Sequence, residues 1–174
     1  DALPISMTYS SAGIGSLIET RSLGDEVRGG IILHQGKLPY YRALVGAIKA
    51  NLQNGRGGAA TSTYYCYDPE VFEIQKLKNP LTPLANRVRE SDYSIGLNKE
   101  FIKRAILDKP FWLFSYKDNP ELYEEFYHAD SNKFDRHLEE FVVENPGKVT
   151  EVKASDLFSL AKAINSKISS FREI

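Results

Sequence analysis

Residues 53–61 read Gln53-Asn54-Gly55-Arg56-Gly57-Gly58-Ala59-Ala60-Thr61, and they lead directly into the strand-like segment Thr61 to Tyr67. Glycine adopts positive φ angles freely and lets a backbone approach a ligand closely. Arg56 stands among these glycines, and a guanidinium can donate to a phosphate or to the edge of a base. The stretch therefore predicts a glycine-rich, ligand-binding loop that enters a β-strand.

A second stretch of the same kind lies upstream. It contains Ala12-Gly13-Ile14-Gly15, then Arg21, then Val27-Arg28-Gly29-Gly30, and 10 of the 12 glycines fall between Gly13 and Gly58. The unusual backbone chemistry is therefore concentrated in the first third of the chain. Two guanidiniums at this spacing can clamp a phosphate chain through charge-assisted bonds, or they can be two solvated surface arginines.

Helical and strand-like patterns alternate along the rest of the chain. The expected helices are Leu38 to Leu52, a short helix from the Asp68 N-cap to Leu77, Asn98 to Leu107, one opened by Asn119-Pro120-Glu121, Ser131 to Glu144, and Ser155 to Ser170. The expected strands are Ala59 to Tyr67, Ser91 to Leu97, Phe111 to Ser115, and Lys148 to Val152. This alternation predicts an α/β fold.

Composition excludes several classes of function. With 174 residues and 42% hydrophobic content, the chain is long enough to form a hydrophobic core. Its net charge of −1 gives no positive electrostatic field that would attract nucleic acid or an anionic membrane. No apolar run approaches the ~20 residues that span a bilayer. We therefore expect no nucleic-acid or membrane partner, and a cytoplasmic location.

The usual metal and redox residues are sparse. The three histidines, His34, His128 and His137, are not clustered with carboxylates at metal-binding spacing, so no metal site is expected. Cys66 is the one cysteine, and within an aromatic strand it is interpreted as a buried thiol rather than a nucleophile. The neighbouring tyrosines 64, 65 and 67 are interpreted as core residues.

Taken together, the motifs resemble the large subunit of ribonucleotide reductase, closest to the class I enzymes of bacteria and their viruses. The resemblance covers roughly Met7 to Lys167. It rests on Ala12 to Gly15, Arg21, Arg28 to Gly30, His34-Gln35-Gly36, Pro39-Tyr40-Tyr41, Gln53 to Thr61, Leu77-Lys78-Asn79, Asn86 to Arg89, Asp92-Tyr93, Asn98-Lys99, Leu113 to Ser115, Asp118 to Tyr123, and Asp156 to Leu160. The same order over most of the chain is far more specific than any single glycine motif.

The resemblance implies roles for particular residues. Arg21 and Arg28 match two arginines that hold the phosphates of an allosteric deoxynucleotide effector. Gln53 and Arg56 match a loop that contacts the substrate base, and Ala12-Gly13 matches a first loop that lies against the substrate nucleotide. The alternative for Gln53 to Gly58 is an ordinary glycine turn between a helix and a strand.

The resemblance also implies a fold and an activity. The fold would be a portion of a ten-stranded α/β barrel, with residues 7–170 forming the partial barrel domain and residues 1–6 and 171–174 unmatched. The activity would be reduction of ribonucleoside diphosphates to deoxyribonucleotides. The family's redox and radical cysteines lie outside the matched region, so we expect an internal piece that has no catalytic residue and is inactive alone.

The implied partners follow from the same resemblance. They are a ribonucleotide substrate, a deoxynucleoside triphosphate effector, the rest of the large subunit, a homodimer partner, and a separate metal-containing subunit that supplies the radical. No cofactor is expected on the chain itself. The alternatives are a piece of a class II, cobalamin-dependent reductase and a stand-alone nucleotide-binding regulatory module.

Overall fold

The computed structural model describes residues 14–50, 58–128 and 131–164. Strands and helices alternate through these residues, as the sequence predicts, and they form three separate sheets rather than a closed barrel. The observed fold is mixed α/β, which confirms the predicted class.

The first sheet is parallel and has the order β1-β4-β5. Strand β1 (Ile14–Leu17) pairs with β4 (Ala60–Tyr65), and β4 pairs with β5 (Ser91–Gly96). In β4 and β5, the same order of buried and exposed side chains ends in two consecutive buried residues. That pattern fits parallel strands covered by helices toward their carboxyl ends.

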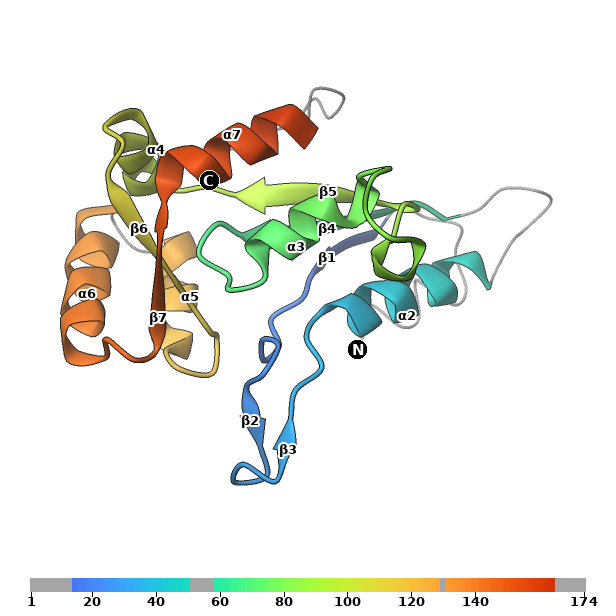
Figure 1. Cartoon of the computed structure of the whole chain (residues 1–174), viewed down its shortest axis with the longest axis horizontal. Coiled ribbons are helices and arrows are strands. Elements are labelled where there is room, and N and C mark those ends of the chain that lie inside the picture. The colour runs from blue at the N-terminus through green and yellow to red at the C-terminus, as the bar shows by residue number, and fades with distance from the viewer. Residues whose placement is uncertain (1–13, 51–57, 129–130, 165–174) are drawn as a thin grey trace.

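The second sheet is a short antiparallel hairpin that no pattern in the sequence predicts. Strand β2 (Glu26–Val27) pairs with β3 (Ile32–Leu33), and the hairpin extends away from the rest of the molecule in Figure 1. Helix α2 (Leu38–Lys49) follows, with Pro39 in its first turn, where a missing N–H costs nothing. Its buried residues, Tyr41, Leu44, Val45 and Ile48, have the predicted helical spacing.

Short helices connect β4 to β5. Helix α3 (Val71–Gln75) continues into the 3-10 helix η1 (Lys76–Lys78), and a second 3-10 helix, η2 (Leu84–Asn86), precedes β5. After β5, the Asn98 side chain accepts a 2.8 Å hydrogen bond from the Phe101 N–H and caps helix α4 (Lys99–Ile106), as predicted.

The third sheet pairs β6 (Pro110–Phe114) with β7 (Val149–Lys153), antiparallel. Helices α5 (Pro120–His128) and α6 (Ser131–Glu144) lie between them in the chain, and α7 (Ala154–Ile164) follows β7. None of the helices in the described ranges is both long and apolar enough to cross a membrane.

The main core gathers aromatic residues from β4, β6, α5 and α6. Tyr67 stacks on Phe114 at 4.9 Å between ring centroids, and Tyr123 meets both rings edge to face. Tyr64, Tyr65 and Tyr67 are all buried, which confirms their interpretation as core residues. The core therefore draws its rings from segments that are far apart in the sequence.

Candidate functional site

The two predicted effector arginines lie on one continuous segment after β1. Arg21 follows the strand by a few residues, and Arg28 stands at the tip of the β2–β3 hairpin. Arg28, Gly29 and Gly30 have φ angles of 52°, 67° and 90°, so three consecutive residues are left-handed. This conformation is costly for Arg28 because its Cβ is crowded there, and the two glycines that follow make the turn possible.

Both arginine side chains are exposed. In the described part of the chain, neither guanidinium forms an ion pair with a carboxylate. The apolar residues around them are also exposed: Ile31 is 83% exposed and Leu23 is 65% exposed. Arg21 just before the hairpin and Arg28 at its tip are thus two exposed cations without a carboxylate partner, which suits an anionic ligand.

Backbone and side-chain hydrogen bonds hold the base of the hairpin. Gly24 donates its N–H to the His34 carbonyl at 2.9 Å, and His34 donates to the Asp25 carbonyl at 2.8 Å. The Asp25 carboxylate accepts the Ser22 N–H at 2.7 Å and the hydroxyl of Ser115. Since Ser115 directly follows β6, this carboxylate ties the arm to the third sheet.

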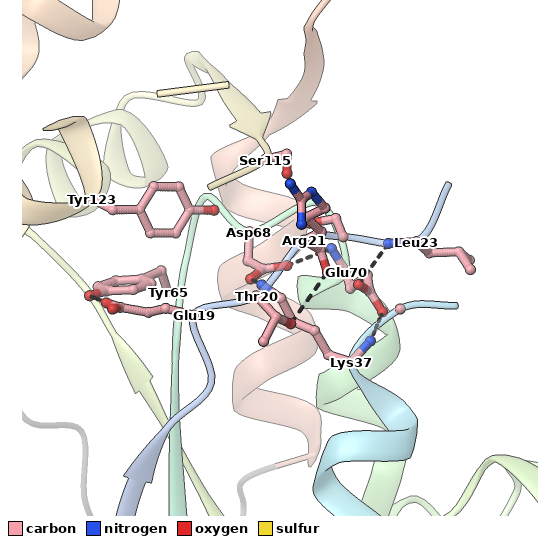
Figure 2. A network of polar contacts seen from close by, with 12 residues as sticks. Glu19, Thr20, Arg21, Leu23, Lys37, Tyr65, Asp68, Glu70, Ser115 and Tyr123 are labelled. Atoms are coloured by element: carbon pink, nitrogen blue, oxygen red, sulfur yellow. Dashed lines mark hydrogen bonds and ion pairs between the residues drawn. The ribbon is translucent and has the colours of Figure 1, made fainter. Parts of the chain in front are cut away.

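A second attachment comes from the connection between β4 and α3 (Figure 2). The Glu70 carboxylate accepts the Leu23 N–H and the Lys37 N–H, each at 2.9 Å. The Lys37 ammonium forms a buried ion pair with Asp68, and Asp68 also accepts the Glu70 N–H at 2.9 Å. Burial lowers the pKa of Lys37 to about 8, and the nearby Glu70 opposes that shift.

Another contact fixes the segment just before Arg21. The Tyr65 hydroxyl donates to the Glu19 carboxylate at 2.5 Å, and Figure 2 shows the two side chains meeting. Because Tyr65 belongs to β4 and to the aromatic core, this bond links the core to the start of the arginine segment.

The four predicted substrate-binding residues, Ala12, Gly13, Gln53 and Arg56, lie outside the described residues. The strands that follow them are described: Ile14 of β1 is in register with Ala60 of β4. The first residues of β1 and β4 therefore lie side by side at one end of the parallel sheet. Arg21 comes after the opposite end of β1.

Sequence reasoning did not identify Lys37, Asp68 and Glu70 as a cluster. Asp68-Pro69-Glu70 predicted a helix start with Asp68 as the N-cap. The helix does follow, but α3 begins at Val71 and its N-cap is Glu70, without a side-chain cap hydrogen bond, so the assignment of Asp68 was wrong. The Glu70 carboxylate instead reaches backbone groups 47 and 33 residues away along the chain. The sequence shows a carboxylate in a helix-start motif and, separately, a lysine beside Gly36. The local pattern around either residue does not indicate that the two lie together in the fold.

A cavity of about 590 Å³ lies beside this cluster. Its walls include Leu23 and Gln35 from the hairpin base, Tyr41 from α2, and Glu70 and Glu73 at α3. Neither arginine lines it, so it is separate from the exposed face of the hairpin.

The remaining candidate residues have structural surroundings. Cys66 is fully buried, and burial raises the pKa of its thiol, which confirms its interpretation as a buried thiol. His34 accepts the Gly36 N–H at 3.2 Å within its turn, and His137 on α6 pairs with Glu125 at 2.8 Å. Across the described ranges, no three His, Cys, Asp or Glu side chains are grouped so that they could hold a metal ion.

Comparison with known proteins gives a consistent result. The family model "Ribonucleotide reductase, barrel domain" matches residues 4–169. Ribonucleoside-diphosphate reductase subunit alpha of Buchnera aphidicola (subspecies Baizongia pistaciae) is 40% identical over 151 residues, and subunit alpha of the corresponding Escherichia coli K12 reductase 1 is 38% identical over 151 residues. The phage T4 alpha subunit is 33% identical over 153 residues.

These matches cover 86% of this chain but only 20% of each relative's length. The chain therefore spans about one fifth of the curated relatives it matches. The residues that the family model matches include the arginine hairpin, the parallel sheet and the aromatic core. Because the family model covers nearly the whole chain, this chain belongs to the ribonucleotide reductase barrel-domain family.

Proposed function

We propose that this chain is part of the alpha subunit of a ribonucleoside-diphosphate reductase, which reduces ribonucleotides to deoxyribonucleotides. The observation that carries the proposal is 40% identity to a reductase alpha subunit across 86% of the chain. The exposed pair Arg21 and Arg28 gives the proposal a physical basis, because it offers two cations to a polyphosphate.

In this proposal the chain binds nucleotides and does not carry out the chemistry. Arg21 and Arg28 hold the phosphates of a deoxynucleoside triphosphate effector. Ala12, Gly13, Gln53 and Arg56 contact the ribonucleotide substrate. The one cysteine, Cys66, is buried and cannot act as both a redox pair and a radical carrier, so the reducing groups belong to other parts of the subunit.

The partners follow from the same assignment. The relatives are named alpha subunits, which favours a second subunit over cobalamin as the source of the radical. We propose a separate metal-containing subunit and a homodimer partner, in the cytoplasm. A stand-alone nucleotide-binding module remains the alternative from a different class of function, and it would bind effector without any associated reductase.

The test uses the full-length subunit together with its radical-generating partner. Deoxynucleotide formation is measured with a dithiol reductant, and effector affinity is measured by calorimetric titration with deoxynucleoside triphosphates. Arg28→Ala should weaken effector binding roughly ten- to hundredfold, because one charge-assisted contact worth ~1.5–3 kcal/mol is lost. Substrate affinity should stay nearly unchanged.

The matched control is Arg136→Ala, which removes an exposed arginine from α6, away from the hairpin. It should bind effector like the wild type. The 174-residue chain alone should form no deoxynucleotide. Activity of the chain alone that survives Cys66→Ser would contradict the division of roles, and unchanged effector affinity in Arg28→Ala would remove the arginines from the effector site.

A further inference from the structure

Glu70 connects both ends of the arginine hairpin to the body of the molecule. One carboxylate oxygen accepts the N–H of Leu23, just before β2, and the other accepts the N–H of Lys37, just after β3. The two residues bracket the whole hairpin, including Arg28. Figure 2 shows Glu70 between the two backbone segments. A single side chain therefore bridges the two ends of the arm, beside the backbone bonds that His34 makes with Gly24 and Asp25.

Neighbouring polar residues fix the position of Glu70 in turn. Asp68 accepts the Glu70 N–H, and Asp68 also holds the Lys37 ammonium, with both partners of that ion pair 1–2% exposed. Lys37 is thus bound twice: its backbone by Glu70 and its side chain by Asp68. A buried charge pair with these extra hydrogen bonds has few alternative arrangements, and removal of one partner leaves the other uncompensated.

Gly36 lets the carboxylate come this close. A Cβ atom on Gly36 would lie 2.6 Å from Glu70 Oε2, and Gly36 has a φ of 81°. Any other residue would push the carboxylate away from the Lys37 N–H. The glycine of this turn is therefore part of the same attachment.

Packing contributes little to the placement of the hairpin. Its large apolar residues, Leu23, Ile31, Ile32 and Leu33, are 48–83% exposed. The arm is held mainly by polar contacts. Besides the Glu70 bonds, Asp25 accepts from Ser115, and Lys37 pairs with Asp68. The His34 ring also stacks on Tyr40 of α2. Without packing to define a position, loss of the Glu70 contacts should let the arm take up other orientations.

We propose that Glu70 is a positioning residue of the effector site: by holding Leu23 and Lys37 it keeps Arg21 and Arg28 in the arrangement that binds a nucleoside triphosphate. The inference rests on the proposed function, since it takes the two arginines as the phosphate-binding groups. Glu70 does not touch the nucleotide. It raises the fraction of molecules in which the arm is ready to bind, and the apparent affinity rises in proportion to that fraction.

The substitution Glu70→Gln tests the proposal in the full-length subunit. The carboxamide keeps the size of the side chain but retains one acceptor oxygen, and it turns an NH₂ group toward one of the two N–H groups. Affinity for a deoxynucleoside triphosphate should fall about tenfold, while affinity for the ribonucleotide substrate stays unchanged. Glu70→Asp keeps the charge but is one methylene shorter, so it should lose affinity to a similar degree.

The matched control is Glu73→Gln, which removes the same charge three residues further on, within α3. Glu73 is exposed and lines the same cavity, but it makes none of the contacts to Leu23 or Lys37. It should bind effector like the wild type. A tenfold loss in this control as well would show that charge near α3 matters, not the attachment of the hairpin, and would overturn the proposal.

Arg28→Ala separates failure of this inference from failure of the proposed function. If Arg28→Ala weakens effector binding and the Glu70 variants do not, the positioning role is wrong and the effector site stands. If neither weakens binding, the effector assignment itself is wrong. In the double variant the two losses should be less than additive, because Glu70 acts through the arginines; full additivity would indicate an unrelated structural effect.

Amide hydrogen exchange gives a measurement on the unmodified protein, which holds even if a Glu70 variant folds poorly. Effector binding should slow exchange at the Leu23 and Lys37 amides, because it selects the attached arrangement of the hairpin. Exchange at these two amides that does not respond to saturating effector would overturn the proposal.

Discussion

The arginine hairpin and the aromatic core are built by opposite means. Residues 22–37 carry exposed apolar side chains and are fixed by the carboxylates of Asp25 and Glu70. The core around Tyr67, Phe114 and Tyr123 is fully buried and is fixed by ring contacts of about 5 Å. One region is positioned by a few directional bonds and the other by dense packing.

The difference shows how one chain can combine a rigid base with an adjustable arm. Packed aromatic rings contribute stability through a large buried area, and their arrangement does not depend on any single contact. A hairpin held by two carboxylates has few contacts to lose, so a ligand can shift its population with modest energy. Helix α2 joins the regions, since it starts at the Glu70 attachment and its Tyr41 and Val45 belong to the main core.

The largest expected effect lies in the core. Phe114→Ala removes a fully buried ring that stacks on Tyr67, and it should lower the free energy of unfolding by about 3–5 kcal/mol. Ile31→Ala at the hairpin should change it by no more than about 0.5 kcal/mol, because that side chain is 83% exposed. The free energy of unfolding of both variants is measured by urea denaturation. A cost for Ile31→Ala near that of Phe114→Ala would mean that the hairpin is packed against something, and the contrast would fail.

The next effect concerns the attachment of the hairpin. Gly36→Ala should lower the free energy of unfolding by about 2–3 kcal/mol, since it adds the strain of a positive φ and displaces the Glu70 carboxylate. Gly24→Ala is the matched control: its φ is 85°, but an added Cβ meets nothing within 4 Å. It should cost only the strain, about 1–2 kcal/mol.

The difference between these two glycine variants measures the close approach of Glu70. The same pair can be compared by hydrogen exchange at the Leu23 amide, which Gly36→Ala should accelerate and Gly24→Ala should leave slow. If both variants lose the same free energy of unfolding and show the same exchange rate at the Leu23 amide, the Glu70 contact does not stabilise the hairpin. The polar attachment would then not be what holds the arm.

Sequence reasoning succeeded where the signal is local. The amphipathic pattern placed α6 at Ser131 to Glu144, as observed, and Asn98 was identified as an N-cap because its helix follows at once. Strand Ala59 to Tyr67 was predicted two residues too long at its carboxyl end, where Cys66 and Tyr67 leave the ladder yet stay buried. Period and capping are properties of a few neighbouring residues, so a single sequence contains them.

The hairpin was missed for a physical reason. Its strands have two residues each, too short for any alternation, and the glycines around Arg28 indicated only a ligand-binding loop. The attachment by Glu70 was also missed, because its partners are distant backbone N–H groups that carry no sequence identity. The role of Arg21 and Arg28 in effector binding stays a prediction, as do the limits of the domain.

The smallest expected effect tests a polar contact inside the packed half. Asp135 on α6 faces Glu100 on α4; burial first, and then that neighbouring carboxylate, raises the pKa of Asp135 to about 7. The folded chain therefore holds a proton that the unfolded chain, with a pKa near 3.8, releases. The bound proton therefore stabilises the folded chain fully below about pH 4, and this stabilisation is lost as the pH rises through 7.

Asp135→Asn keeps a neutral side chain at every pH and should leave stability unchanged at pH 4. At pH 8 it should raise stability by less than about 1 kcal/mol, because the partly exposed pair is screened by solvent. Thermal unfolding at a series of pH values makes the measurement, with the exposed Glu140→Gln on the same helix as the control that shows no such trend. An effect on stability as large as that of Gly36→Ala would mean that α4 and α6, like the hairpin, are held by their charges. A small effect means that the rings around Phe134 hold these two helices. The pair Asp135 and Glu100 then only adjusts a position that packing has already set.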